Sequence, residues 1–129
     1  MKAKKRNGFI KLEREILETA AWLAIARTGA LALLVDIWAR YNGRNNGQIS
    51  YSQREAERRF GCSPKRAVKW FRDLQTAGFI VAVQRGTFHQ KTGTFPARAT
   101  TWRLTMEPCG GEAPTREYLN FASTGESDA

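Results

Sequence analysis

Four basic side chains stand close together in one short stretch of the chain, and the chemistry open to them is the binding of anions. They are Lys65, Arg66, Lys69 and Arg72. Ser63 and Pro64 precede them, as the N-cap and the first residue of a helix that we predict over 64–77. The first turn of a helix carries partial positive charge and favours acidic residues, yet this turn has Lys65 and Arg66. The reversal predicts that an anionic partner approaches this helix end.

The apolar residues of the same helix indicate which side the cations occupy. A stripe at three- and four-residue spacing is formed by Ala67, Trp70, Phe71, Leu74 and Ala77. The stripe is expected to face the core, which leaves the cations and Asp73 on the outer surface. A pair between Lys69 and Asp73 across one turn would contribute only about 0.2–0.5 kcal/mol. Charged outer faces are common among helices, so solvation alone is the competing interpretation.

Further basic residues fall in predicted loops and on a neighbouring helix. A long hairpin loop carries Arg85, His89, Lys91 and Arg98. The segment NGRNNG contains Arg44, but Asn and Gly are typical of turns, and the segment lacks the spacing of known phosphate-binding loops. Arg54 and Arg58 lie on the helix before 64–77. These three arginines are further candidates for contacts with the backbone of a polyanion.

Two helices joined by a tight turn are expected to hold the basic residues. Ser52 and Glu55 have the spacing of a capping box, which predicts a helix start, and Gly61 predicts the end of that helix. The second helix begins two residues later, and Gly78 terminates it. Together the two helices have the dimensions of a helix-turn-helix motif.

A β-hairpin is predicted directly after these helices. The run FIVAVQRG is apolar and β-branched, and the run TTWRLTM alternates. The second run is expected to point Trp102, Leu104 and Met106 inward. Its polar residue Thr105 is expected to point outward. With a brief strand around Ile49, this predicts a mainly helical α+β domain, a winged helix-turn-helix with an N-terminal helical extension.

The N-terminal part predicts one or two short helices through about Ala26, followed by a longer helix. The inward face of that longer helix is expected to hold Leu31, Leu34, Val35, Trp38 and Tyr41. We expect three regions: a disordered basic arm over 1–8, the winged domain over 9–106, and an extension over 107–129 with a short helix at 115–121 and an acidic disordered tail.

The composition indicates which class of partner and which cellular compartment to expect. The formal net charge is +9 over 129 residues, and the chain after Thr105 is acidic overall. A basic body favours a polyanionic partner. Two distant cysteines favour a reducing cytosol, so we expect a cytoplasmic protein, and no apolar run reaches the length of a membrane span.

Catalysis and metal binding have no supporting pattern. Cys62, Cys109 and His89 lack the paired spacing of zinc ligands. The sequence holds no nucleophile–base–acid set and no phosphate-binding loop. We therefore expect no enzymatic activity, no metal, no cofactor and no small-molecule substrate.

The residues around the two helices resemble those of bacterial winged helix-turn-helix DNA-binding proteins. The resemblance rests on Ala56 in REAERRFGCS, on Gly61 and Ser63 at the turn, and on Phe71, Leu74 and Gly78-Phe79-Ile80 at the end of the second helix. The runs RYNGRNNGQISYSQREA, GFI and TTWRLT resemble a narrower group, the small helix-turn-helix proteins of alphaproteobacterial phages, plasmids and other mobile elements. The resemblance covers roughly 9–121.

The resemblance implies a sequence-specific double-stranded DNA-binding protein that acts as a transcriptional regulator or as a replication or maintenance factor of a mobile element. In that arrangement the helix at 64–77 enters the major groove and the basic hairpin loop lies on the backbone. Arg66 would read a base edge, because its guanidinium matches guanine acceptors. Lys65, Lys69 and Arg72 would contact phosphates. Ser63, at the start of the helix, is the fifth residue of this helix expected to contact DNA.

Two alternatives concern partners. The same face could bind an acidic protein, with the tail from Glu107 to Asp128 folding back as a competitor. Motifs of this kind often bind DNA as dimers. The segment REYLNF or the N-terminal helices would then supply a homodimer interface, or would instead pack within one chain.

Overall fold

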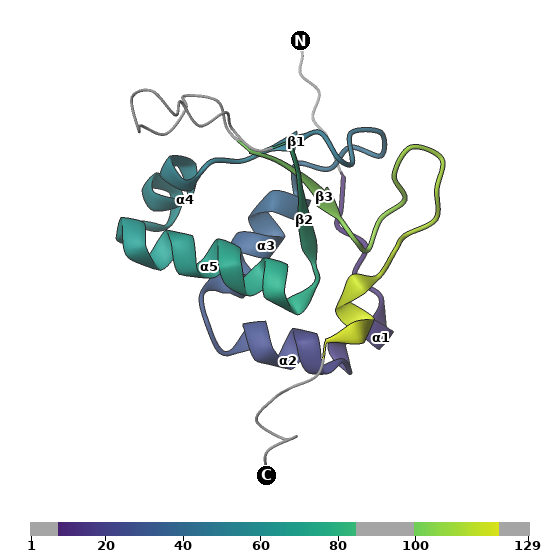
Figure 1. Cartoon of the computed structure of the whole chain (residues 1–129), viewed down its shortest axis with the longest axis horizontal. Helices are drawn as coiled ribbons and strands as arrows, with labels where there is room; N and C mark the ends of the chain where they lie inside the picture. Colours follow the sequence, from purple (N-terminus) through teal and green to yellow (C-terminus); the bar gives the residue numbers. More distant parts are fainter. Residues whose placement is uncertain (1–7, 85–99, 122–129) are drawn as a thin grey trace.

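The computed structural model describes residues 8–84 and 100–121, which form helices around a small sheet (Figure 1). The elements are α1 (Arg14–Leu17), α2 (Ala20–Ala26), α3 (Ala30–Trp38), β1 (Ile49–Ser50), α4 (Gln53–Phe60), α5 (Pro64–Ala77), β2 (Ile80–Gln84), β3 (Thr101–Leu104) and the 3-10 helix η1 (Glu117–Asn120). The α+β class is as predicted. The basic arm was predicted over 1–8, and all of it except Gly8 lies outside the described residues, as does the end of the acidic tail at 122–129. These parts stay predictions.

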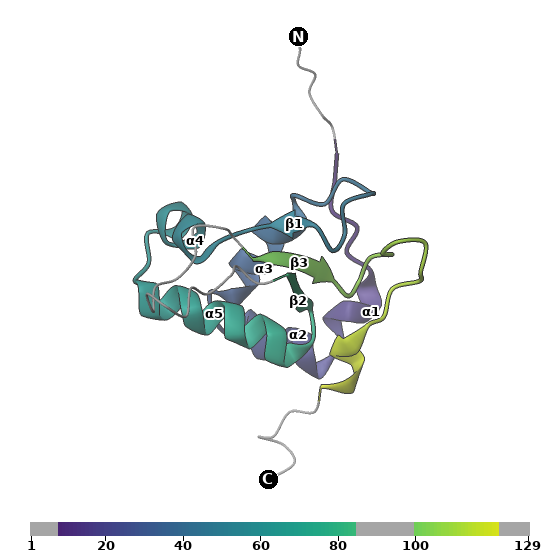
Figure 2. The ribbon, with the colours of Figure 1, turned by 45° about the horizontal axis from the view of Figure 1, so that its top comes forward.

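The three strands form an antiparallel sheet in the order β1-β3-β2. Strands β2 and β3 pair as the predicted hairpin, with Ile80 opposite Leu104. Strand β1 lies on the other side of β3, with Ile49 opposite Trp102. Figure 2 shows the sheet above α5 and α2. The Phe71 ring of α5 stacks on Trp102 with ring centroids 5.3 Å apart, so α5 packs directly against the central strand.

Local signals set the bounds of α4 and α5. The Ser52 hydroxyl accepts from the Glu55 N–H at 3.1 Å, while the Glu55 carboxylate accepts from the Ser52 N–H at 2.8 Å, which is the predicted capping box. Gly61 ends α4 in the left-handed conformation, with φ +61°. Ser63 caps α5 by accepting from the Arg66 N–H at 3.1 Å. The predicted range 64–77 is confirmed.

The buried face of α3 differs from the predicted one. Leu34 and Trp38 are buried as expected, but Val35 is 43% exposed. Leu33 and Ile37 are buried in its place. Helix α3 is apolar on nearly every side, so its periodicity does not single out one face. Packing against both α2 and α5 decides which residues are covered.

The turn between α2 and α3 is a sharp, hydrogen-bonded corner. The Thr28 hydroxyl donates to the Ile25 carbonyl at 3.2 Å and accepts from the Ala30 N–H at 3.0 Å. The bend between the two helices is 110°. Within the described residues, no single helix is long and apolar enough to cross a membrane. Only the bent pair of α2 and α3, counted as one segment, has that length and apolar character.

The chain after β3 folds back onto the body. Thr105 was predicted to point outward, but it is fully buried, because its hydroxyl donates to the Gly78 carbonyl at 2.7 Å at the end of α5. The predicted short helix is the 3-10 turn η1, whose buried Tyr118 stacks on Phe79 with ring centroids 5.2 Å apart. Part of the segment REYLNF therefore packs within the chain, while Leu119 stays 59% exposed.

Candidate functional site

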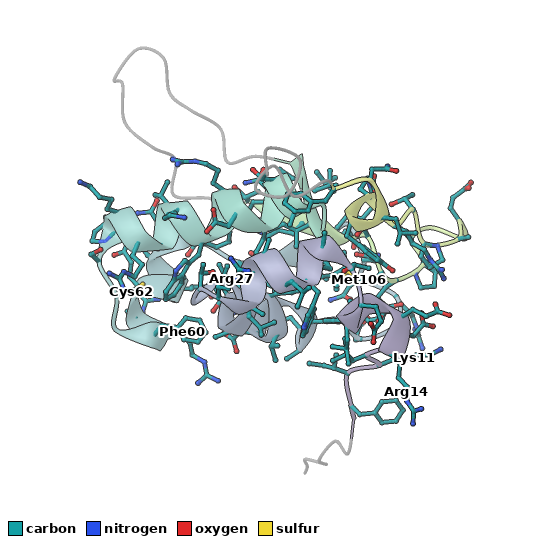
Figure 3. The ribbon with its side chains drawn as sticks, turned by 90° about the horizontal axis from the view of Figure 1, so that it is seen from below. Lys11, Arg14, Arg27, Phe60, Cys62 and Met106 are labelled. Atoms are coloured by element: carbon teal, nitrogen blue, oxygen red, sulfur yellow. The ribbon has the colours of Figure 1, made fainter. Side chains whose placement is uncertain are left out.

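A groove of about 920 Å³ runs along the N-terminal half of α5, between that helix and the α2–α3 corner. It is lined by Arg27, Thr28, Gly29, Ser63, Lys65, Arg66, Val68, Lys69, Trp70 and Arg72. All five residues predicted for the functional face of this helix, from Ser63 to Arg72, line this one groove. Arg27 was not predicted, and Figure 3 shows it beside α5.

The groove is strongly basic. Five of its described lining residues are Lys or Arg, and none of them is Asp or Glu. Lys69 makes the ion pair that its spacing suggested, with its Nζ 3.0 Å from Asp73 Oδ2. Among the described residues, no carboxylate lies within ion-pair distance of Lys65, Arg66 or Arg72. Positive charge in the groove therefore exceeds what the described part of the molecule neutralises.

The side chain of Ser63 has a structural task as well as a place in the groove. Its oxygen accepts the Arg66 N–H and so satisfies one of the open donors at the start of α5. Its hydroxyl proton is left to donate to a partner. Arg66 is exposed and its backbone is held by this cap. The helix start is thus ordered while its cationic side chains extend into the groove.

The other predicted basic residues do not line the groove. Arg54 and Arg58 are exposed on α4, and Arg44 is exposed in the loop before β1. That loop is the predicted turn, because Asn42 Oδ1 accepts from the Arg44 and Asn45 N–H groups at 2.8 and 3.1 Å. The predicted wing residues lie outside the described residues: Arg85, His89, Lys91 and Arg98.

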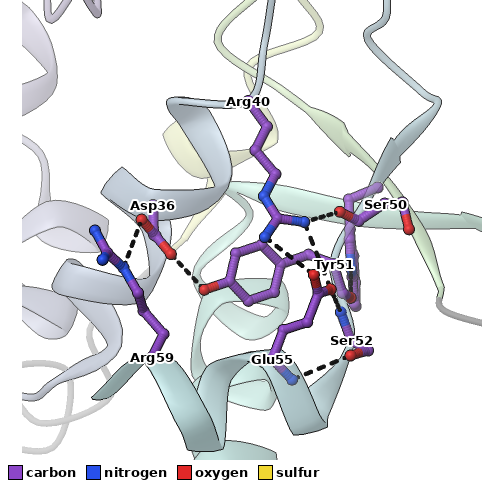
Figure 4. A network of polar contacts seen from close by, with 8 residues as sticks. Asp36, Arg40, Ser50, Tyr51, Ser52, Glu55 and Arg59 are labelled. Atoms are coloured by element: carbon purple, nitrogen blue, oxygen red, sulfur yellow. Dashed lines mark hydrogen bonds and ion pairs between the residues drawn. The ribbon is translucent and has the colours of Figure 1, made fainter.

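A polar network fixes α4, and through it the turn before α5, against α3 (Figure 4). Asp36 of α3 accepts from the Tyr51 hydroxyl and pairs with Arg59 Nε at 3.3 Å. Burial and the bond to Asp36 raise the pKa of Tyr51 well above its ordinary value. Arg40 lies over the Tyr51 ring at 4.1 Å and pairs with Glu55 at 3.1 Å. The network therefore joins α3, the residue after β1, and α4.

A buried asparagine that the sequence did not single out ties the loop before β1 to the end of β3. The Asn46 amide donates to the carbonyls of Leu104, Glu107 and Pro108 at 2.9–3.0 Å and accepts from the Leu104 N–H at 2.6 Å. Asn46 belongs to NGRNNG, where residue type alone indicates a turn. No local signal separates this buried asparagine from its exposed neighbours.

The described part of the chain has no cluster of side chains arranged as metal ligands. No three His, Cys, Asp or Glu side chains there are grouped to hold an ion. Cys62 and Cys109 are free and half-buried, and the Cys109 thiol lies 3.3 Å from the Asn46 carbonyl.

The site is thus a cationic groove with two walls, α5 and the α2–α3 corner. The chain matches no protein-family model, no curated protein and no solved structure.

Proposed function

We propose that this protein binds double-stranded DNA with sequence specificity and that its fold is a winged helix-turn-helix. Three features of the fold support the proposal. Helices α4 and α5 are joined by a short turn through a left-handed glycine. The β2–β3 hairpin follows α5, and β1 pairs with β3 beside it. In a winged helix-turn-helix with this order of elements, α5 is the helix that would enter a major groove.

The observation that carries the proposal is the unbalanced charge of the groove along α5. Five cations share it, and two of them, Lys65 and Arg66, stand in the first turn of the helix. Each cation there costs about 0.3–1 kcal/mol against the helix dipole. DNA phosphates would reverse that cost, because a helix N-terminus with added cations is a strong anion site. A polyanion is the partner that makes this arrangement favourable.

The side chains divide by their chemistry. Arg66 is exposed and has no ion-pair partner among the described residues, and its planar guanidinium can bind guanine O6 and N7 together. Lys65, Lys69 and Arg72 would hold phosphates and set the position of α5. Lys69 would exchange its pair with Asp73 for a phosphate. The wing residues, from Arg85 to Arg98, and Arg44, Arg54 and Arg58 are proposed as backbone contacts on sequence grounds alone.

The biological role follows from the resemblance and is part of the proposal. A cytoplasmic transcriptional regulator, or a replication or maintenance factor of a mobile element, would use such an interface at a defined site. A homodimer on a palindromic site would supply the affinity that one motif lacks. Selection of bound duplexes from a random pool tests both points, since a palindromic consensus indicates a symmetric dimer and no consensus contradicts sequence specificity.

Substitution of Arg66 tests the assignment of roles. With the selected duplex and a random duplex, log affinity against log salt should fall with a slope near −0.9 per neutralised phosphate. Arg66→Ala should cost about 1–3 kcal/mol on the selected duplex and relax preference at one base pair. Lys65→Ala is the matched control, because it should weaken both duplexes equally. Equal losses on both duplexes for Arg66→Ala would contradict base reading.

An acidic protein is the alternative partner, because the same charges would attract carboxylates. It is distinguished by the absence of salt-dependent duplex binding together with binding to polyglutamate. The predicted competing tail runs from Glu107 to Asp128. Its described part does not line the groove, because Glu107 accepts from Trp38 Nε1 at 2.8 Å and Glu117 pairs with Arg103 at 3.1 Å. The part beyond 121 lies outside the described residues. Deletion of 123–129 should raise DNA affinity at low salt if the tail competes, and unchanged affinity would exclude it.

A further inference from the structure

We propose that the α2–α3 corner is a second DNA-binding element, in which Arg27 holds a phosphate of the strand that flanks α5. This inference rests on the proposed function and adds a residue and an element to it. Arg27 lies outside the helix-turn-helix pair, at the C-terminal end of α2, and reaches the site only because α2 and α3 pack beside α5.

The corner approaches α5 closely at an aromatic contact, in addition to the packing of α2 and α3 on that helix. Trp70 of α5 packs on Gly29, and a Cβ built at Gly29 would lie 2.1 Å from Trp70 Cζ2. Phe60 of α4 also packs against Trp70 edge to face, with ring centroids 5.9 Å apart. A corner that approaches this closely has little freedom to slide along α5. Arg27, two residues before Gly29, is therefore anchored at the mouth of the groove.

The other polar groups of the corner already have hydrogen-bond partners, so the Arg27 guanidinium is the group that can bind a phosphate. The Thr28 hydroxyl already donates to Ile25 and accepts from Ala30, so it has little left for a ligand. The backbone N–H of Thr28 also donates to the Ile25 carbonyl, at 3.1 Å. The Arg27 side chain is exposed, and no carboxylate in the described part of the molecule pairs with it. Its guanidinium suits a phosphate oxygen pair.

The position of Arg27 selects phosphate over base as its target. A helix in the major groove has phosphate strands along its flanks, while base edges lie beneath its outer face. The corner and the N-terminal half of α5 line the same groove, so Arg27 shares it with Lys65 and Arg66. A phosphate strand in the groove would thus meet cations from both walls. Arg27 should position the duplex without reading its sequence.

A different role for Arg27 predicts different measurements. A cation at the C-terminal end of α2 is favoured by the helix dipole. In that case Arg27→Ala would lower the melting temperature and leave the salt dependence of DNA binding unchanged. A phosphate contact instead changes the salt dependence and leaves thermal stability nearly intact.

The experiment measures binding of the full chain to the selected and random duplexes across a salt series. Arg27→Ala should reduce the slope by about 0.9 and weaken both duplexes by the same factor, about three- to tenfold at low salt. Arg27→Lys should restore most of the slope. Arg14→Ala is the control, since Arg14 is exposed on α1 well away from Arg27 (Figure 3), and it should change the slope little.

The outcomes separate this inference from the proposed function. If Arg66→Ala alters binding but Arg27→Ala changes neither slope nor affinity, the second element is wrong and the proposed function stands. A loss on the selected duplex alone would also overturn the inference, because it would make Arg27 a base reader. If the wild-type chain shows no salt-dependent duplex binding, the proposed function itself fails.

Discussion

Gly29 is the residue on which the shape of the groove depends. Its backbone has φ −72°, a conformation open to any residue, so left-handed geometry does not explain the glycine. The missing side chain does, because the Trp70 ring occupies the space that a Cβ would need. A single hydrogen in place of a methyl group lets the α2–α3 corner approach α5 and bring Arg27 to the groove.

Gly29→Ala should therefore lower the free energy of unfolding by about 1–3 kcal/mol, the usual cost of overpacking. Urea denaturation followed by far-ultraviolet circular dichroism measures it. Gly8→Ala is the matched control, since no heavy atom lies within 4 Å of a Cβ built there. Equal stability of the two variants would mean that Trp70 moves aside without cost and that the contact does not anchor the corner.

At the scale of elements, α5 carries both the core stripe and the cationic face. Ala67, Phe71 and Leu74 are buried as predicted, while Trp70 is only partly covered because it lies at the corner. The outer face has one acid close to its cations, Asp73, whose pair with Lys69 is exposed on the Lys side and contributes little to stability. Asp73 should affect DNA binding more than stability, since it neutralises Lys69, a residue that we propose contacts a phosphate.

Asp73→Asn should tighten duplex binding at low salt by about twofold, because it frees Lys69 from a pair of about 0.2–0.5 kcal/mol and removes a charge that repels phosphates. A salt titration of duplex affinity measures the gain, which should shrink as salt rises. Glu18→Gln makes the same change in net charge at the end of α1, and it should give a smaller gain in duplex affinity. Equal gains from both variants would show that only overall charge matters.

At the scale of the whole molecule, stability depends on a network that joins parts of the chain distant in sequence. Arg40, two residues after the end of α3, pairs with Glu55 of α4 and lies over the Tyr51 ring beside β1. Partial burial of Glu55 acts to raise its pKa, but hydrogen bonds from the Ser52 N–H and from Arg40 outweigh it, so the pKa of Glu55 is lowered. The ionised form is thus favoured by folding.

Because its pKa is lower in the folded chain than in the unfolded chain, Glu55 stabilises the fold at neutral pH. The contribution should disappear as the pH falls from about 4.3 through the folded-state pKa. Glu55→Gln should be less stable at pH 7 and lose less stability between pH 7 and pH 3, as measured by urea denaturation. Glu112→Gln, an exposed control, should keep the wild-type pH profile. An unchanged profile for Glu55→Gln would contradict the role of the network.

Much of the fold and one wall of the site could be predicted because their signals are local. The bounds of α4 and α5 follow from Ser52, Gly61 and Ser63, which act on N–H groups within a few residues. Prediction was wrong where burial depends on neighbours. Val35 and Thr105 have suitable residue types for either face, and only packing against α5 and its end decides their exposure.

The amino-acid sequence by itself determined that a capped helix would carry a cationic outer face and an apolar inner stripe, because caps and periodicity operate over three or four neighbouring residues. Tertiary structure alone decided that Arg27 faces the same groove and that Asn46 joins Leu104 across 58 residues of chain. Such contacts arise when helices and strands pack in three dimensions, and no spacing along the chain encodes the distance between their side chains.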